Sequence, residues 1–295
     1  MYPIVAAESI APDVRRIVVG APRIAAKHRA GQFVIVRVTP DGERIPLTLA
    51  EADSDEGSIT LFVQAIGRTT TLMSELEAGD FLVDVAGPLG RASEIKRYGT
   101  AVVVGGGLGT AIAYPIAKAL AGEGNRVIAI VGGRSREYVL LEDQLTTHGI
   151  EVIPCTDDGS YGRPGFVTEA LADVITTEDV GIVFAAGPVP MMGAVAETTR
   201  PDGIETIASL NPIMVDGTGM CGGCRVEVGG ATKFACVDGP EFDAHEVDFD
   251  LLERRNTSYR AFEAKRLRDL ESLDAVHHEQ VLAPVRGACA PEEAT

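Results

Sequence analysis

The sequence predicts a small antiparallel β-barrel, then an α/β domain on a doubly wound, five-stranded parallel sheet, and finally a small loop module. Three observations support this class of fold. Short runs of alternating apolar and polar residues fill residues 1–97. Apolar strands alternate with helical patterns over residues 98–209. A segment rich in glycine and cysteine follows over residues 210–253.

The barrel is predicted from five short runs that are separated by Gly, Pro or Asp-Gly punctuation. The runs are RRIVVGAP, GQFVIVRV, RIPLTLAEA, SITLFVQAI and DFLVDVAGP. Alternation of this kind places one side of each run in a core. Short strands at this spacing are typical of a small antiparallel barrel.

After Lys96 the pattern changes to strands that are each followed by a helix. The five predicted strands are AVVVGG, RVIAIVGG, IEVIPC, GIVFAAG and IETIAS. This alternation predicts a parallel sheet whose ligands lie beyond the carboxyl ends of the strands. Those ends read GGGLG, GGRSR, CTDDGSYG and AAGPVPMM, and each is glycine-rich or polar, as a cofactor-binding edge should be.

The composition narrows the possible partners. The chain has 295 residues and a formal net charge of −17. An acidic surface argues against a general binder of nucleic acid or of anionic membranes, because both need basic surface. Residues 99–117 carry no charge, but the GGGLG in their middle divides them into a strand and a helix, so we predict no membrane span.

The cysteine content indicates the compartment. The first residues lack the basic region and apolar core of a signal peptide. Five cysteines without a secretory signal suggest a reducing environment, where thiolates are available to bind metal. We therefore expect a cytoplasmic protein.

The first candidate site is VVVGGGLGTAIAYPIAKAL, an apolar strand that runs through glycines into a helix. Gly106, Gly107 and Gly109 would let the backbone turn tightly and approach a pyrophosphate at the helix N-terminus. The alternative is a tight turn without a ligand. No acidic residue ends the second strand, so Arg134 or Arg136 could meet a ribose phosphate or lie on a solvated face.

The second candidate is the pair RIPLTLA and AIGRTTTLM in the barrel. It offers hydroxyl groups beside Gly67 and Arg68 that could contact a phosphate or the edge of a flavin ring. These hydroxyls belong to Thr48, Thr69, Thr70 and Thr71. Composition alone favours ordinary strand and turn residues.

The third candidate lies in residues 215–242, which hold three of the five cysteines. Asp216 precedes Cys221 by five positions, Cys224 follows after two intervening residues, and Cys236 after eleven more. A plant-type two-iron cluster uses C-x4-C-x2-C and a distant cysteine, so Asp216 stands where the first cysteine should be. The glycines between suit a loop that wraps a cluster closely. The alternatives are a zinc knuckle or three reduced, unliganded thiols.

The rest of the chain is less informative. Cys155 ends an apolar strand and is interpreted as a small buried residue, although it faces the cofactor edge. Residues 254–295 form the last segment: a charged amphipathic helix, then a tail that we expect to be flexible from about residue 274. Cys289 lies in that tail and is a poor candidate for a ligand.

The order of these motifs resembles the ferredoxin–NADP reductase superfamily, in the branch that contains the electron-transfer subunit of dihydroorotate dehydrogenase B. The motifs are GPLG, GGGLGTA, TDDGSYG, AAGPVPMM and CVDGPEF. The chain is especially similar to the small subunits of NADH-dependent ferredoxin:NADP oxidoreductase, also called sulfide dehydrogenase subunits. The likeness covers about residues 1–260, and MVDGTGMCGGCRV and FACVDGPEFD are its most specific parts.

The resemblance implies FAD on the barrel (1–97), NAD(H), with NADP(H) as an alternative, on the α/β domain (98–209), and a [2Fe–2S] cluster in the module (210–253). Hydride transfer then takes place on FAD and needs no catalytic side chain. The residues implied for FAD are Arg44, Pro46, Leu47, Thr48, Ile66, Gly67, Thr69 and Thr70. Those implied for the nucleotide are Gly106, Gly107, Gly109, Thr110, Arg134, Asp157, Gly187 and Pro188. The metal ligands are Asp216, Cys221, Cys224 and Cys236.

Two departures stand out in the flavin strand, which in the wider superfamily reads Arg-x-Tyr-Ser/Thr. Arg44 is four residues before Thr48 rather than three, and Leu47 occupies the aromatic position. We therefore expect no tyrosine of this strand to stack on the flavin. Asp216, by contrast, matches the ferredoxin:NADP small subunits and disfavours zinc.

The resemblance implies an iron–sulfur flavoprotein oxidoreductase subunit that moves electrons between NAD(H), FAD and the cluster. Its expected partner is a larger iron–sulfur flavoprotein subunit, with ferredoxin reached through an electron-bifurcating heterodimer. Alternatives are the electron-transfer subunit of a dihydroorotate-dehydrogenase-like complex, a stand-alone NAD(P)H reductase, and a zinc-bearing regulatory module that binds nucleotide.

Overall fold

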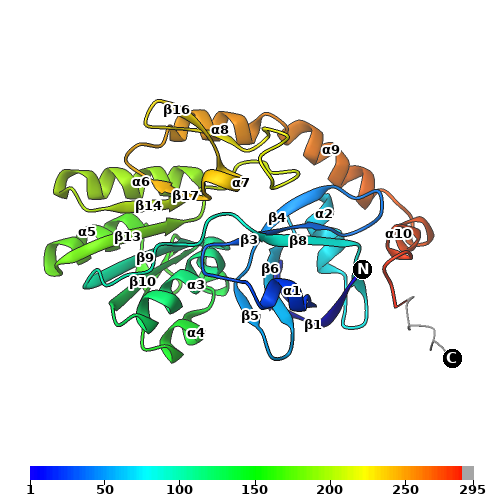
Figure 1. Cartoon of the computed structure of the whole chain (residues 1–295), viewed down its shortest axis with the longest axis horizontal. Helices are drawn as coiled ribbons and strands as arrows, with labels where there is room; N and C mark the ends of the chain where they lie inside the picture. Colours follow the sequence, from blue (N-terminus) through cyan, green and yellow to red (C-terminus); the bar gives the residue numbers. More distant parts are fainter. Residues whose placement is uncertain (288–295) are drawn as a thin grey trace.

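The computed structural model describes residues 1–287. It contains a β-barrel, an α/β domain and a small module at the β14–β17 edge of the α/β sheet, and helices from the C-terminal segment run back to the barrel (Figure 1). Cys289 lies outside the described residues.

Two antiparallel sheets form the barrel, with strand orders β5-β6-β2-β1-β7 and β4-β3-β8. They enclose a core in which Val34, Leu61 and Leu72 are almost fully buried. Every strand pair is antiparallel, as the sequence predicts. The elements are β1 (Tyr2–Ala11), β2 (Val14–Gly20), α1 (Pro22–Ala25), β3 (Phe33–Arg37), β4 (Arg44–Thr48), β5 (Glu51–Asp53), β6 (Ser58–Gln64), α2 (Arg68–Ser74), β7 (Phe81–Leu82) and β8 (Asp84–Leu89).

The α/β domain has the predicted parallel strands β9, β10, β11, β13 and β14, but its sheet is larger than predicted. Seven strands pair in the order β12-β11-β10-β9-β13-β14-β17. The prediction of five strands missed β12, which has two residues, and β17. Strand β17 pairs antiparallel with β14 and comes from the C-terminal module. Both missed strands are too short to show alternation. The elements are β9 (Thr100–Gly106), α3 (Gly109–Gly122), β10 (Arg126–Gly133), η1 (Arg136–Tyr138), α4 (Glu142–Thr147), β11 (Glu151–Thr156), β12 (Arg163–Pro164), α5 (Val167–Thr177), β13 (Val180–Ala186), α6 (Val189–Thr199), η2 (Arg200–Asp202), β14 (Thr206–Ser209) and β17 (Glu241–Asp243).

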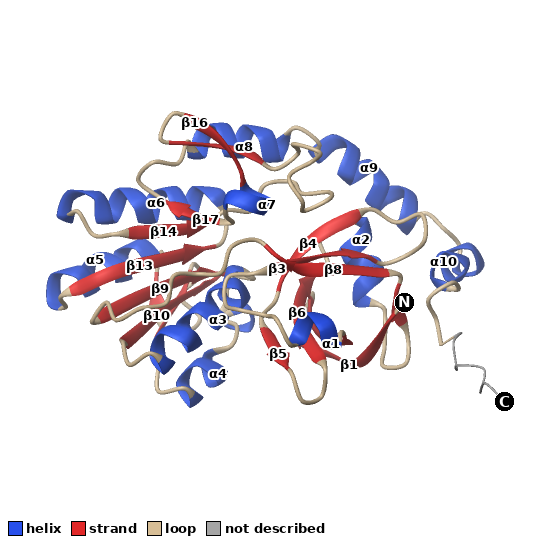
Figure 2. Cartoon of the chain, in the orientation of Figure 1, coloured by secondary structure: helices blue, strands red, loops and turns tan. Residues whose placement is uncertain are grey.

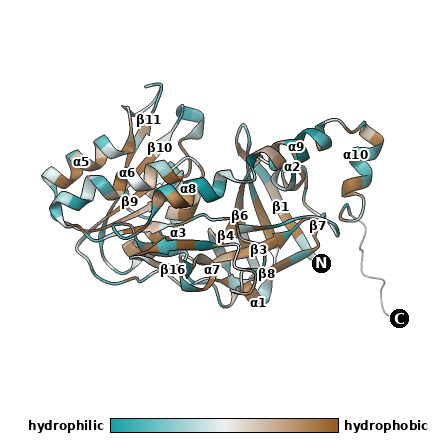
Figure 3. Cartoon of the chain, turned by 90° about the horizontal axis from the view of Figure 1, so that it is seen from above, coloured by the Kyte–Doolittle hydropathy of each residue, from teal (hydrophilic) through white to brown (hydrophobic). Residues whose placement is uncertain are grey.

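Helices cover both faces of this sheet, as a doubly wound fold requires (Figure 2). Alternate residues of β9 enter different cores: Val102 and Val104 pack with α5 and α6, whereas Ala101 and Val103 pack with α3. Because both faces are buried, the strands read as continuous apolar runs. They are brown in Figure 3, whereas α9 is mostly teal.

The module joins the sheet through β17 and carries a small hairpin of β15 (Arg225–Val228) and β16 (Ala231–Phe234), followed by α7 (Ala235–Asp238). The chain then forms α8 (Phe249–Thr257), α9 (Arg260–Glu271) and α10 (Ala275–Leu282). The expectation of a flexible tail from about residue 274 is wrong for residues 274–287. There, Asp274 caps α10 by accepting a hydrogen bond from the His277 amide, and Leu282 and Val285 are buried in the barrel core.

Candidate functional site

The three cysteines of the module lie on the turn after β14 and on α7. Cys224 and Cys236 are buried, with their Sγ atoms 3.2 Å apart, and Cys221 is exposed. Two thiolates on one tetrahedral metal with bonds of roughly 2.3 Å stand about 3.8 Å apart. The spacing of Cys224 and Cys236 is thus close to that of two ligands of one metal ion.

Burial sets the protonation of these thiols. Desolvation, and then the hydrogen bond with Cys224, raise the pKa of Cys236 to about 12. The thiolate therefore needs a cation to form at neutral pH, and a bound metal ion supplies one. Within residues 1–287, no three His, Cys, Asp or Glu side chains already stand as a closed metal cage.

Asp216 has contacts of its own in the loop. Its Oδ1 accepts a hydrogen bond from the Thr218 amide at 2.9 Å, and its Oδ2 accepts one from the Cys221 amide at 2.8 Å. The amide of Thr218 is the main reason why the pKa of this carboxyl is lowered. The carboxylate therefore braces the turn that carries Cys221, and the same hydrogen bonds favour its ionised form.

The loop also presses against the barrel. Gly217 has a φ of +73°, and a Cβ there would come within 2.6 Å of Leu89 and 2.8 Å of Ile35. Glycine is thus required both by the left-handed backbone and by the close approach. This contact places the cysteines beside β3, the neighbour of the predicted flavin strand. The donor set, the absence of a disulfide among the described cysteines and this tight loop all fit an iron–sulfur cluster.

A cavity of about 760 Å³ lies between the cysteine loop and the predicted flavin strand β4. It is lined on one side by Arg44 and Ile45 of β4, on another by residues 212–215 and 221–223, and on a third by Tyr259 and Phe262 of the α8–α9 segment. It has the size of a cofactor site.

In β4 itself, alternate residues face different surroundings. Thr48 pairs with Phe33 and Pro46 with Ile35, and these two β3 residues belong to the core shared with the cysteine module. Leu47 instead packs against the barrel core. The structure therefore puts Thr48 and Pro46 on the face toward the module. Arg44 forms an ion pair with Asp84 at 3.2 Å.

The turn that the sequence assigned to the FAD pyrophosphate begins helix α2. The Thr70 hydroxyl accepts hydrogen bonds from the amides of Gly67 at 3.0 Å and Ile66 at 3.1 Å, so it closes the turn. Thr69 is buried and its hydroxyl lies 3.5 Å from Glu43, which lines the cavity. Ile66 is 70% exposed.

The two predicted nucleotide loops, after β9 and after β13, pack directly on each other. A Cβ on Gly109 would overlap the Ala186 carbonyl and Gly187, and one on Gly106 would overlap Met191, which is close to Pro188. Gly107 is different, because its φ is +54° and its Cβ direction is open. Close packing of the two loops thus explains why residues 106 and 109 are glycines. Of the three glycines, Gly107 alone faces open space.

One polar group at this turn lacks a partner. The hydroxyl of Thr110 is buried and no described residue offers it a hydrogen bond. Unpaired buried polar groups are unusual and need an explanation, such as a ligand or a water molecule.

The same sheet edge carries the predicted Arg134 and Asp157, whose loops are joined by the hydrogen bond from the Asp157 amide to the Gly133 carbonyl at 3.1 Å. The guanidinium of Arg134 lies 4.6 Å from the Tyr138 ring centre, and that of Arg136 lies 5.0 Å from the Tyr161 ring centre. Neither tyrosine was among the predicted site residues, although both follow strand ends, which is a signal for this edge.

A contact that the sequence does not predict lies where the barrel, the linker after it and the module meet. The Ser93 hydroxyl donates to Glu241 at 2.6 Å, and burial raises the pKa of that carboxyl to about 7. Neither residue belongs to a recognisable motif, because they are 148 positions apart in the chain.

A barrel, a doubly wound domain and a cysteine loop, with a cavity between the barrel and that loop, define the class of iron–sulfur flavoprotein reductases. Two family models agree with this class: the oxidoreductase FAD-binding domain matches residues 1–93, and the iron–sulfur cluster binding domain of dihydroorotate dehydrogenase B matches residues 211–248. The second match selects iron–sulfur over zinc.

The chain belongs to the family of dihydroorotate dehydrogenase B electron-transfer subunits. It is 45% identical over 251 residues to the electron transfer subunit homolog of Thermotoga maritima, covering 85% of this chain and 89% of the relative. The electron transfer subunit of Geobacillus thermodenitrificans is 34% identical, covering 83% and 96%.

A solved structure of NADH-dependent reduced ferredoxin-NADP oxidoreductase superposes with a TM-score of 0.88 at 42% identity, covering 92% of this chain and 98% of that one. Phthalate dioxygenase reductase, with a TM-score of 0.56 at 20% identity, shares the fold. The chain is therefore an oxidoreductase subunit that uses FAD, an iron–sulfur cluster and a nicotinamide nucleotide. In residues 1–287, no helix is long and apolar enough to cross a membrane.

Proposed function

We propose that this chain is the small subunit of an electron-bifurcating NADH-dependent ferredoxin:NADP oxidoreductase. The observation that carries the proposal is the cavity that joins Arg44 and Ile45 of β4 to Cys221 of the cluster loop. FAD, when bound, exchanges electron pairs with the nicotinamide, and the cluster carries electrons singly. A cavity bordered by the predicted flavin strand on one side and by the cluster loop on the other is the arrangement that such an exchange would need.

The chain's own residues hold and orient these groups. We assign the flavin ring to the face of β4 that bears Thr48, and the FAD pyrophosphate to the turn from Ile66 to Thr70. The nicotinamide nucleotide lies on the sheet edge formed by Gly107, Gly187 and Asp157. Asp216, Cys221, Cys224 and Cys236 are the four proposed cluster ligands.

Two features favour this subgroup over a subunit of a dihydroorotate-dehydrogenase-like complex. The similarity to the ferredoxin-NADP oxidoreductase structure spans almost the whole of that chain. In addition, an aspartate takes the place of the first cysteine. The dihydroorotate subunit and a stand-alone NAD(P)H reductase are the alternatives. The four described cysteines are free thiols, which supports a cytoplasmic location.

Spectroscopy of the pure protein tests the proposal. We expect flavin bands with a broad iron–sulfur shoulder, and rapid bleaching when NADH is mixed anaerobically in a stopped-flow instrument. A colourless protein, or one that contains zinc, would contradict it. Comparison of NADH with NADPH in the same instrument decides the nucleotide, for which Arg134 and Arg136 leave both choices open.

We further propose where the larger flavoprotein subunit docks. Met220, next to Cys221, is 87% exposed, and Tyr259 and Phe262 at the cavity are 59% and 58% exposed. Exposed apolar residues around a redox centre are typical of an interaction surface. Met220→Lys should abolish co-purification of the larger subunit after co-expression, whereas Val276→Lys on the distant helix α10 should not. Equal recovery with both variants would contradict this docking face.

A further inference from the structure

The C-terminal segment 249–287 connects the two ends of the molecule. Helix α8 packs on α6 and β15, and α9 passes over α2 of the barrel (Figure 1). After α10, the Val285 carbonyl accepts a hydrogen bond from the Phe81 amide of β7. The family models end at residues 93 and 248, so neither match includes this segment. We call residues 249–287 the strap.

Apolar side chains fix the strap at both ends. Leu252 of α8 is buried in the core shared by the α/β domain and the cluster module. Leu270, Leu282 and Val285 are buried in the barrel core. The strap therefore belongs to two cores and joins them.

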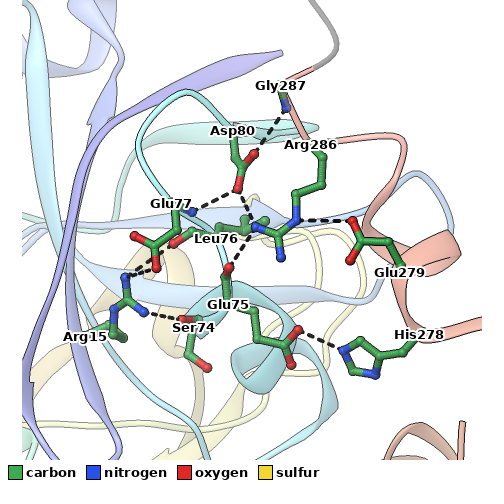
Figure 4. A network of polar contacts seen from close by, with 10 residues as sticks. All are labelled: Arg15, Ser74, Glu75, Leu76, Glu77, Asp80, His278, Glu279, Arg286 and Gly287. Atoms are coloured by element: carbon green, nitrogen blue, oxygen red, sulfur yellow. Dashed lines mark hydrogen bonds and ion pairs between the residues drawn. The ribbon is translucent and has the colours of Figure 1, made fainter. Parts of the chain in front are cut away.

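Polar contacts also hold the strap to the barrel (Figure 4). We call the contacts of Arg286 and His278 with Asp80 and Glu75 the clamp. Arg286 donates to the Asp80 carboxylate at 2.8 Å and to the Glu75 carbonyl at 2.9 Å, and the Gly287 amide donates to Asp80 at 3.1 Å. His278 lies 2.8 Å from the Glu75 carboxylate. Asp80 is buried, and a buried carboxylate needs a partner, so Arg286 is its matched cation.

Between these two ends the strap forms a wall of the cavity. Tyr259 and Phe262 line the cavity opposite β4. Arg255 of α8 donates to the Gly223 carbonyl in the cluster loop at 3.3 Å. Arg266 of α9 lies 3.5 Å from Glu43, the same carboxylate that meets Thr69 in the proposed pyrophosphate turn. The wall thus reaches from the cluster loop to the start of α2.

The clamp also holds the C-terminal end of helix α2. Glu75 is the C-cap of α2, and both its carbonyl and its carboxylate are bound by the strap. Movement of α10 would therefore release the C-terminal end of α2. Helix α9 packs on α2, so the wall would lose part of its support even while Leu270 stays in the barrel core.

We propose that the strap retains FAD: the clamp of Arg286 and His278 on Asp80 and Glu75 holds α9 in place as the outer wall of the FAD cavity. The inference depends on the proposed position of FAD in this cavity. It predicts that FAD leaves the protein at a rate set by detachment of residues 275–287.

The test compares FAD release from the full-length holoprotein by the rise of flavin fluorescence after dilution. In the double variant His278→Gln/Arg286→Ala, release should be about tenfold faster, because charged hydrogen bonds of this kind contribute more than neutral ones. The matched control is Glu279→Gln, which removes only the outer pair of Arg286 at 3.8 Å and should release FAD at the wild-type rate. If the double variant does not fold, Arg286→Lys takes its place. Lysine keeps the positive charge but lacks the planar guanidinium, and it should also release FAD faster than the wild type.

Hydrogen exchange of residues 275–287 and EPR of the cluster are measured on the same samples. Faster exchange and faster FAD release, with an unchanged cluster signal, are the expected results. Faster exchange with wild-type FAD release would overturn the strap as a retaining wall, and unchanged exchange would overturn the clamp. A wild-type protein that carries no FAD would instead contradict the proposed function.

Discussion

At the scale of single residues, Asp216 is the proposed oxygen ligand of the cluster. The structure gives its carboxylate a second task, because both oxygens accept amide hydrogen bonds from the loop. Asp216→Cys should keep the cluster and shift its midpoint potential by on the order of tens of millivolts, since a thiolate replaces an oxygen ligand. Redox titration followed by EPR measures this shift.

Asp216→Asn separates the two roles. It retains an oxygen acceptor for the brace, but it lacks the anionic ligand. Unchanged potential and EPR in both variants would show that Asp216 braces the loop without binding the cluster.

Glu241 is the residue for which we predict a pH effect. Burial raises its pKa from 4.5 to about 7 in the folded protein. Between these values the folded state binds more protons, so the stability that this group contributes is complete below pH 4.5 and is lost as the pH rises through 7. Glu241→Gln should therefore increase the free energy of unfolding at pH 8 by at most about 3 kcal/mol, which raises the melting temperature. At pH 5 the substitution should change little.

Thermal unfolding by circular dichroism at the two pH values measures the effect. Glu253→Gln, at an exposed position of α8, is the control and should leave both melting temperatures unchanged. A Glu241→Gln gain that is equal at both pH values would mean that titration of Glu241 does not destabilise the protein.

At the scale of elements, the two nucleotide loops behave as one unit. Gly109→Ala should cost about 2–4 kcal/mol and weaken NADH binding, because the new Cβ would overlap the Ala186 carbonyl and separate the loops. In Gly107→Ala the new Cβ contacts no protein atom, so the loss of stability comes from the left-handed backbone alone and is roughly 1–2 kcal/mol. Denaturant unfolding compares the stability of the two variants, and NADH titration measures the binding of Gly109→Ala. Equal losses would contradict the packing explanation.

The elements that the sequence predicted correctly are those with strong local periodicity. The apolar runs of β9, β10 and β13 are buried on both faces, so their pattern is continuous and their helices follow in order. β17 could not be predicted in this way, because its three residues are defined by pairing with β14, about 35 positions earlier in the chain.

Helix α10 shows the same limit. Its apolar residues follow no clear period, and its position depends on Leu282 and Val285 entering a core formed by residues far away in the sequence. Asp274 as an N-cap was the one local signal. In the candidate site, the spacing placed the cysteines on one loop, but only the fold shows the Ser93–Glu241 contact and the strap beside the cavity.

At the scale of the whole molecule, the barrel and the α/β domain share a core. Val14, Ala50 and Phe62 of the barrel pack in one buried cluster with α3 and the strands of the parallel sheet. Tyr114 of α3 donates to Glu51 of β5 at 3.0 Å across the same boundary. The strap joins the two domains a second time, so we expect them to unfold together.

Phe62→Ala tests this coupling, with Leu61→Ala as its neighbour in β6. Leu61 points into the barrel core and Phe62 into the shared core. Truncation of a buried aromatic or leucine side chain costs roughly 2–5 kcal/mol, so both variants should melt earlier. Only Phe62→Ala removes contacts between domains, and its calorimetric transition should broaden or divide into two, whereas that of Leu61→Ala should stay single. A single sharp transition in Phe62→Ala would mean that the shared core does not couple the domains. Because bound FAD also stabilises the barrel in our proposal, the two variants must be compared at equal flavin content.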